Sequence, residues 1–101
     1  IDKHTLDIIA ASQAMLDSGQ PFQLLSGYRS PQTNAMLRRK SRRVAKYSLH
    51  MFGQAADLRM SNRSTKQIAR AAVACRGGGV GRYRRAGFVH IDCGPLRTWN
   101  G

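Results

Sequence analysis

The sequence is poor in acidic residues: it has no glutamate and only five aspartates, against 17 lysines and arginines. The formal charge is +12 and the pI is near 11.3. Such a charge favours an anionic partner, which could be nucleic acid, a membrane surface or an acidic polymer. Because acids are so few, each aspartate in a polar pattern is a candidate for a specific role.

Other absences narrow the class of protein. No apolar run approaches the ~20 residues of a membrane span, so we expect none. A length of 101 residues with 42% hydrophobic content predicts one globular domain, residues 1–101, which we expect to be monomeric. No basic and apolar leader opens the chain, so we expect any export signal to lie outside it.

Cysteine is scarce as well, and Cys75 and Cys93 lack the CxxC spacing of a zinc ribbon or redox motif. They form either one disulfide, which would indicate an oxidising compartment such as the periplasm, or two buried thiols. The sequence leaves both alternatives open. The glycine-rich run 77–81 lacks the Lys-Ser/Thr of a P-loop, so we interpret it as a structural turn.

Hydrophobic periodicity predicts three helices and three strands. The predicted helices are Thr5 to about Leu16, Pro31 to about Lys40, and Thr65–Arg76 with Ser64 as its cap. The predicted strands are Phe22–Ser26, Ala55–Met60 and Gly87–Asp92. These elements indicate an α+β fold with a small antiparallel sheet flanked by helices.

Three polar residues are candidates for one site. Asp57 alternates with apolar residues in its predicted strand, as does His90 in FVHID, so both point away from the core. If the two strands pair antiparallel, the two side chains share one face, and His50 in SLHMFGQAAD reaches them from a loop. Two imidazoles and a carboxylate suit Zn²⁺ and leave a fourth position for water, which favours hydrolysis of an amide.

Four segments occur in order and cover almost half of the chain: SGYRSPQTNAMLR, SLHMFGQAADLR, GGVGRY and FVHIDCGPLRTW. They resemble the zinc D-Ala-D-Ala metallopeptidase family, which is grouped with lysostaphin-type peptidases and the hedgehog domain, and within it the periplasmic murein endopeptidase branch. The resemblance implies a hedgehog/D-Ala-D-Ala peptidase-like fold and one Zn²⁺ per chain, bound by His50, Asp57 and His90. It also implies a periplasmic hydrolase that cleaves peptide cross-links of peptidoglycan.

The same resemblance suggests roles for three further residues. Arg29 in SGYRS would approach the substrate peptide, where a guanidinium can hold a carboxylate or a developing oxyanion. Ser48 would support the ligand loop and the bound substrate. Relatives often have a His or Glu shortly before the last zinc ligand, but Gly87 and Phe88 stand here. Asp92 is therefore the nearest candidate to orient a ligand, the water or the substrate, or to move a proton.

Two other functions compete with this one. The basic composition favours a nucleic-acid-binding domain, although the chain has no helix-turn-helix, zinc-finger or RNA-sheet signature. The second alternative is a zinc-bearing cell-wall-binding module without catalysis, because the His or Glu that acts as general base or oxyanion partner in relatives is absent here. The sequence also leaves open which bond is cleaved: D-Ala to diaminopimelate, diaminopimelate to diaminopimelate, or a terminal D-Ala.

Overall fold

The computed structural model describes residues 3–26 and 54–101. Within these ranges the elements are α1 (Lys3–Leu16), β1 (Gln23–Ser26), β2 (Ala55–Arg59), α3 (Thr65–Ala74), β3 (Gly79–Tyr83), β4 (Phe88–Asp92) and β5 (Arg97–Asn100). The strands form one five-stranded sheet in the order β1-β2-β4-β3-β5. All neighbours are antiparallel except β3 and β5, which are parallel. The predicted α+β class with a mainly antiparallel sheet is therefore confirmed.

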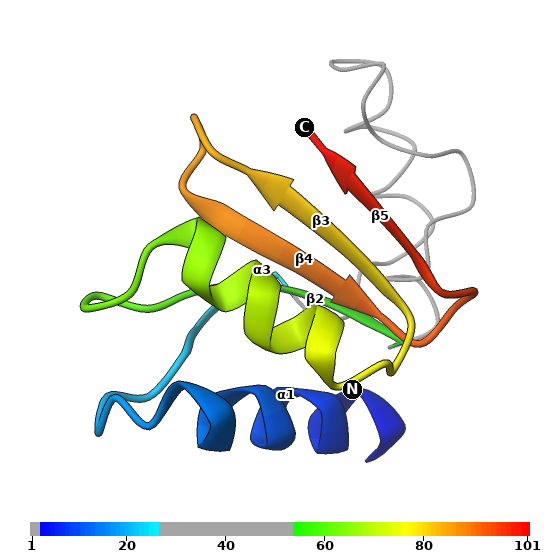
Figure 1. Ribbon diagram of the computed structural model, residues 1–101, viewed down its shortest axis with the longest axis horizontal. Coiled ribbons are helices and arrows are strands. Elements are labelled where there is room, and N and C mark those ends of the chain that lie inside the picture. The colour runs from blue at the N-terminus through cyan, green and yellow to red at the C-terminus, as the bar shows by residue number, and fades with distance from the viewer. Residues whose placement is uncertain (1–2, 27–53) are drawn as a thin grey trace.

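The two described helices lie on one side of the sheet, where α3 packs on β3 and β4 and α1 runs alongside α3 (Figure 1). Apolar side chains from both layers fill the space between them, among them Ile8, Leu58, Ile68, Val89 and Ile91. Burying such side chains stabilises the fold by about 1.5–3 kcal/mol each before the conformational entropy of folding is counted. This core fixes which face of each strand is left for the site.

Helix α3 begins where the sequence predicts. The Ser64 hydroxyl accepts a hydrogen bond from the Gln67 backbone N–H at 3.1 Å, and the Gln67 side chain accepts one from the Ser64 N–H at 2.9 Å. This capping box satisfies two backbone donors at the helix start, which explains why a segment that follows a turn becomes helical here. The helix ends at Ala74, two residues before the predicted end.

Two strands were not predicted. We interpreted residues 77–81 as a turn, but Gly79 to Tyr83 forms β3, which pairs with both β4 and β5. Glycine weakens a strand pattern, yet it is needed here for close approach: a Cβ on Gly79 would meet Arg97 and Asp92, and one on Gly81 would meet the Trp99 ring. Strand β5 was missed because its four residues, RTWN, show no apolar alternation.

The two cysteines are free thiols. Cys75 lies beside Ser12, with Sγ 3.5 Å from the hydroxyl oxygen, whereas Cys93 lies beside Thr5, at 3.7 Å. Ser12 and Thr5 are seven residues apart on α1, which separates them by about 10 Å along the helix. A disulfide needs Cα atoms within about 7 Å, so the thiol alternative is the one that the structure supports.

The predicted helix from Pro31 to about Lys40 lies outside the described residues. In the ranges 3–26 and 54–101, no helix is long and apolar enough to cross a membrane.

Candidate active site

Strands β2 and β4 bring Asp57 and His90 together. The two strands are antiparallel with Asp57 opposite His90, and the Asp57 Oδ1 lies 3.1 Å from the His90 Nδ1. Their neighbours in sequence, Leu58 and Val89, point to the opposite face and are fully buried in the core. The predicted pairing and the predicted common face of the two polar residues are both confirmed.

His90 lies between two carboxylates. Its Nδ1 faces Asp57, and its Nε2 is 2.8 Å from the Oδ2 of Asp92, two residues further along β4. The side chain is 14% exposed. Burial lowers the pKa of His90, but the hydrogen bonds and charges of Asp57 and Asp92 outweigh that effect, so the pKa is raised above its ordinary value. The imidazole is therefore fixed in orientation from both sides.

Asp92 is the most enclosed polar residue of the site, with a side chain that is 0% exposed. Besides His90, its carboxylate accepts hydrogen bonds from the Gly79 N–H at 2.9 Å and the Gly94 N–H at 3.0 Å. Burial alone would raise the pKa of Asp92, but the donors His90, Arg97 and Gly79 hold it well below its usual range. Strand alternation puts Asp92 on the same side of β4 as His90, but its side chain is buried, and its oxygens are occupied by donors.

Arg97 completes this arrangement and was not singled out from the sequence. Its two terminal nitrogens contact the two oxygens of Asp92 at 2.9 and 2.8 Å, and one of them also donates to the Pro95 carbonyl at 2.9 Å. The guanidinium lies 4.9 Å from the centre of the Trp99 ring, a cation–π distance. The signal was present in FVHIDCGPLRTW, where Arg97 stands five residues after Asp92, but only the fold shows that β5 returns it to that carboxylate.

Trp99 forms a side wall of the site. Its ring centre is 5.3 Å from that of His90, with the planes inclined by 50°, and its indole N–H donates to the Tyr83 hydroxyl at 2.9 Å. Tyr83 in turn stacks on Phe88 at 4.7 Å. Gly81 makes room for the indole, because a side chain there would occupy the same space. This aromatic wall was also missed, since no local pattern links residues from β3, β4 and β5.

The other predicted site residues, Arg29, Ser48 and His50, lie outside the described residues. Within residues 3–26 and 54–101, no group of three His, Cys, Asp or Glu side chains could hold a metal ion. Asp57 and His90 nevertheless supply a carboxylate oxygen and an imidazole nitrogen side by side, which are two of the donor types that Zn²⁺ uses. The bond from Nε2 to Asp92 matches the carboxylate–histidine arrangement that orients metal-binding histidines. These two residues fit part of a zinc site that needs further ligands.

A small α+β domain with an Asp–His pair across two strands of its sheet defines a candidate hydrolase. More specifically, the chain belongs to the family described as peptidoglycan L,D-endopeptidase MepK, whose model matches residues 1–99. This family falls within the zinc D-Ala-D-Ala peptidase-like group, so the resemblance of the four sequence segments is confirmed.

Two relatives illustrate the match. The chain is 48% identical over 99 residues to peptidoglycan L,D-endopeptidase MepK of Escherichia coli strain K12, which covers 98% of this chain and 54% of that protein. It is 47% identical over 80 residues to the probable peptidoglycan L,D-endopeptidase MepK of Haemophilus influenzae, covering 79% and 43%. The chain thus spans about half the length of the curated relatives it matches. No solved structure matches it.

Proposed function

We propose that this chain carries the peptidase domain of a zinc-dependent murein endopeptidase that hydrolyses L,D cross-links of peptidoglycan. The observation that carries the proposal is the cross-strand pair of Asp57 and His90, braced by the buried Asp92, in a member of this family. The preference for L,D bonds rests on the printed names of the relatives. The periplasm, where such cross-links are found, is the proposed location.

We assign His50, Asp57 and His90 as the zinc ligands, of which the last two have donor atoms 3.1 Å apart. When bound, Zn²⁺ would supply Lewis acidity, which polarises a peptide carbonyl and lowers the pKa of water. In the proposed zinc-bound form, His90 would donate its Nε2–H to Asp92, so that its Nδ1 lone pair would face the side of the ring where Asp57 lies. Asp92 would then favour this tautomer and hold the ring in its orientation.

Asp92 acts in this proposal as a positioning residue and not as the group that moves the proton. Its carboxylate has no exposed surface and accepts bonds from His90, Arg97 and two backbone N–H groups. A base must reach the attacking water within hydrogen-bonding distance, which such an enclosed carboxylate does not. In the described part of the chain, the remaining acids and His4 belong to α1 or its C-terminal end, on the other side of the sheet. Arg29 and Ser48 are proposed to contact the stem peptide.

Digestion of purified sacculi tests this function. Sacculi that contain both L,D and D,D cross-links are incubated with the zinc-loaded protein, and the released muropeptides are analysed by mass spectrometry. We expect loss of the L,D-linked dimers, and no loss with His90→Ala or after zinc is chelated. His4→Ala, which changes a histidine of α1, serves as the matched control and should remain active.

Three results would contradict the proposal in different ways. Loss of only D,D-linked dimers would overturn the L,D assignment. Full activity of His90→Ala would overturn the zinc site. Stoichiometric zinc binding without cleavage of any cross-link would instead favour the non-catalytic cell-wall module, which the enclosure of Asp92 and the presence of Phe88 and Gly87 before His90 make the main competitor.

A further inference from the structure

A groove of about 540 Å³ opens between α3, β3 and β5. Its position is on the helix side of the sheet, because Val80, which lines it, points into the core shared with α3. The face that carries Asp57 and His90 is the opposite one. The groove combines two kinds of lining: apolar side chains of Ala69, Val73 and Val80, and cationic side chains of Lys66, Arg70 and Arg82.

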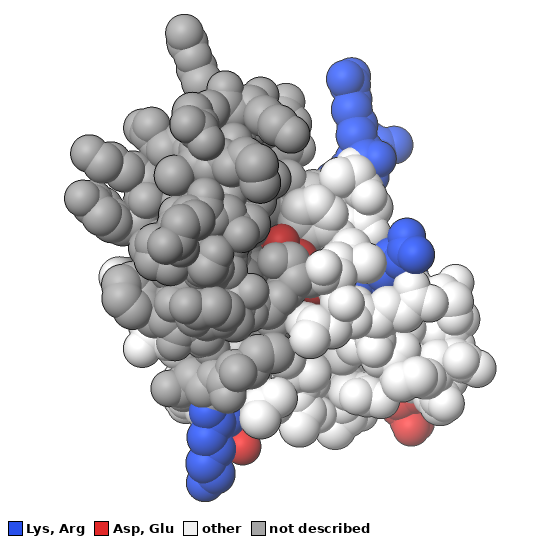
Figure 2. Space-filling view, turned by 180° about the vertical axis from the view of Figure 1, so that it is seen from behind, with Lys and Arg blue, Asp and Glu red and all other residues white. Residues whose placement is uncertain are grey.

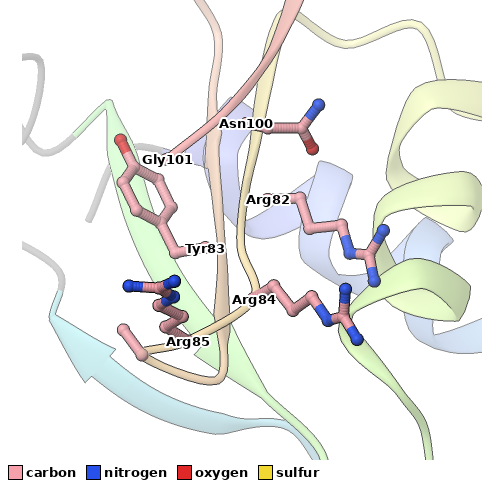
Figure 3. Close-up of a pocket in the computed structure, with 7 residues that line it drawn as sticks. Arg82, Tyr83, Arg84, Arg85, Asn100 and Gly101 are labelled. Atoms are coloured by element: carbon pink, nitrogen blue, oxygen red, sulfur yellow. The ribbon is translucent and has the colours of Figure 1, made fainter.

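A second hollow, of about 470 Å³, adjoins the first at the turn between β3 and β4. The two share Arg82 and Asn100, so they adjoin at these residues. Figure 3 shows that Arg82 and Arg84 extend in the same direction, towards the helices, whereas Tyr83 and Arg85 lie on the other side of the strand. We call the cations on the helix side the basic surface, defined by Lys66, Arg70, Arg82 and Arg84; Arg85 lies on the other side of the same turn.

The charge of the basic surface is not balanced by the described part of the protein. No carboxylate of residues 3–26 or 54–101 lines either hollow. Arg82 is held in place by a neutral oxygen, since its Nε donates to the Thr65 hydroxyl at 3.0 Å. Figure 2 shows the opposite face, where the described basic side chains stand at the edges, including the upper right, where the β3–β4 turn lies. Cations gathered without counterions favour the binding of an anion.

The basic surface is connected to the candidate active site through two aromatic residues. Tyr83 lines the second hollow and accepts a hydrogen bond from the Trp99 indole at 2.9 Å. The Trp99 ring in turn lies 5.3 Å from that of His90. A chain-like ligand that leaves the site past Trp99 and Tyr83 would meet Arg85 at the β3–β4 turn, and around that turn it would reach Arg84 and the groove beside α3.

We propose that the basic surface binds the carboxylate-bearing peptide stems of the peptidoglycan strand that adjoins the bond being cleaved. This inference rests on the proposed function, which makes peptidoglycan the polymer at hand. Stem peptides combine free carboxylates with methyl and methylene groups, which matches a lining that is both cationic and apolar. The surface would hold the polymer while the opposite face of the sheet cleaves it.

Nucleic acid fits the same surface less well. Single strands bind where aromatic rings offer a face for base stacking. Trp99 lines the groove and Tyr83 lines the second hollow, but the indole packs against Gly81 on the face of His90, and the Tyr83 ring stacks on Phe88. The cationic lining alone would also attract the phosphates of a nucleic acid. The experiment below therefore compares binding of peptidoglycan with binding of single-stranded DNA.

The test compares two variants with the same net charge. Arg70→Gln/Arg84→Gln removes two cations of the basic surface, and Arg59→Gln/Arg76→Gln removes two exposed arginines that line neither hollow. Binding to purified sacculi is measured by co-sedimentation with zinc chelated, so that cleavage does not interfere. We expect the first variant to bind about tenfold more weakly, the combined effect of two exposed ion pairs, and the control to bind nearly as wild type does. Sacculi with amidated carboxyl groups should bind wild type as weakly as native sacculi bind the first variant.

Hydrolysis provides the second measurement. The first variant should cleave a small soluble cross-linked muropeptide at the wild-type rate but need a higher concentration of sacculi for half-maximal activity. Equal loss of binding in both variants would overturn the proposal, because net charge would then explain the binding. Tighter binding to single-stranded DNA than to sacculi would also overturn it. A wild type that cleaves nothing, yet binds sacculi through Arg70 and Arg84, would defeat the proposed function and leave this inference standing.

Discussion

Arg97 holds Asp92 through a two-pronged contact in which Nη1 meets Oδ1 at 2.9 Å and Nη2 meets Oδ2 at 2.8 Å. The carboxylate is fully enclosed, whereas the arginine side chain is 41% exposed. An enclosed carboxylate without a cation would be costly, so the arginine is what allows Asp92 to remain ionised beneath His90. The orientation of His90 therefore depends on a residue of β5 that does not touch it through a hydrogen bond.

Asp92→Asn separates a positioning role from a proton-transfer role. The amide keeps one acceptor oxygen but loses the charge that pairs with Arg97 and favours Nε2–H on His90. We expect zinc affinity to fall about 10- to 100-fold, as for other carboxylates that support a metal-binding histidine. Competition with a chromogenic chelator measures this affinity, with Asp7→Asn on α1 as the matched control. Unchanged zinc affinity with lost hydrolysis would instead assign the proton transfer to Asp92.

Replacement of Arg97 tests the ion pair that supports Asp92, and through Asp92 the position of His90. Arg97→Met leaves the Asp92 carboxylate without its cation and should lower the free energy of unfolding by about 2 kcal/mol, the size of hydrogen bonds to a charged group. Arg97→Lys keeps the charge but not the planar fork, so it should recover only part of that loss. Urea unfolding measures both, and Arg76→Met is the control for removal of an exposed arginine. If Arg97→Met were as stable as the control, the contact would contribute nothing to the fold.

The sequence predicted the parts of the site that follow from strand alternation. Asp57 and His90 each stand among apolar neighbours at a spacing of two, so the core fixes the face on which both side chains appear. Their register then needed only the assumption of antiparallel pairing, which β2 and β4 confirm. The Ser64 cap was predictable for the same reason, because its hydrogen bonds involve residues three positions apart.

Residues that meet through distant strands could not be predicted in this way. Arg97 and Trp99 reach Asp92 and His90 only because β5 pairs in parallel with β3, and no local pattern reveals such a pairing. Strand β3 was not predicted because its glycines interrupt the alternating pattern of a strand. They leave space for the side chains of Trp99 and Arg97, which a Cβ would occupy. The burial of Asp92 could not be predicted, because strand alternation indicates on which face of the sheet a side chain lies but not how far it is buried.

The cysteines give a prediction about covalent structure. Because Cys75 and Cys93 pack beside residues seven positions apart on α1, both thiols should remain reduced in protein purified without reductant. Unfolding in the presence of an alkylating reagent, followed by mass spectrometry, should show both residues modified in each chain. The double variant with serine at both positions should show no modification. Recovery of unmodified wild type, with alkylation only after reduction, would show that a disulfide forms.

The contact between Gly81 and Trp99 gives a prediction that combines stability with the shape of the site wall. A methyl group at Gly81 would occupy the space of the indole ring, so Gly81→Ala should displace Trp99 and cost about 1–3 kcal/mol, as overpacking does. The displaced indole should lose its hydrogen bond to Tyr83, and the fluorescence of this tryptophan, the only one in the chain, should shift. Removal of the ring in Trp99→Ala relieves the overlap, so Gly81→Ala should cost much less in that background than in wild type. Equal costs in the two backgrounds, measured by urea unfolding, would mean that the indole does not require glycine at this position.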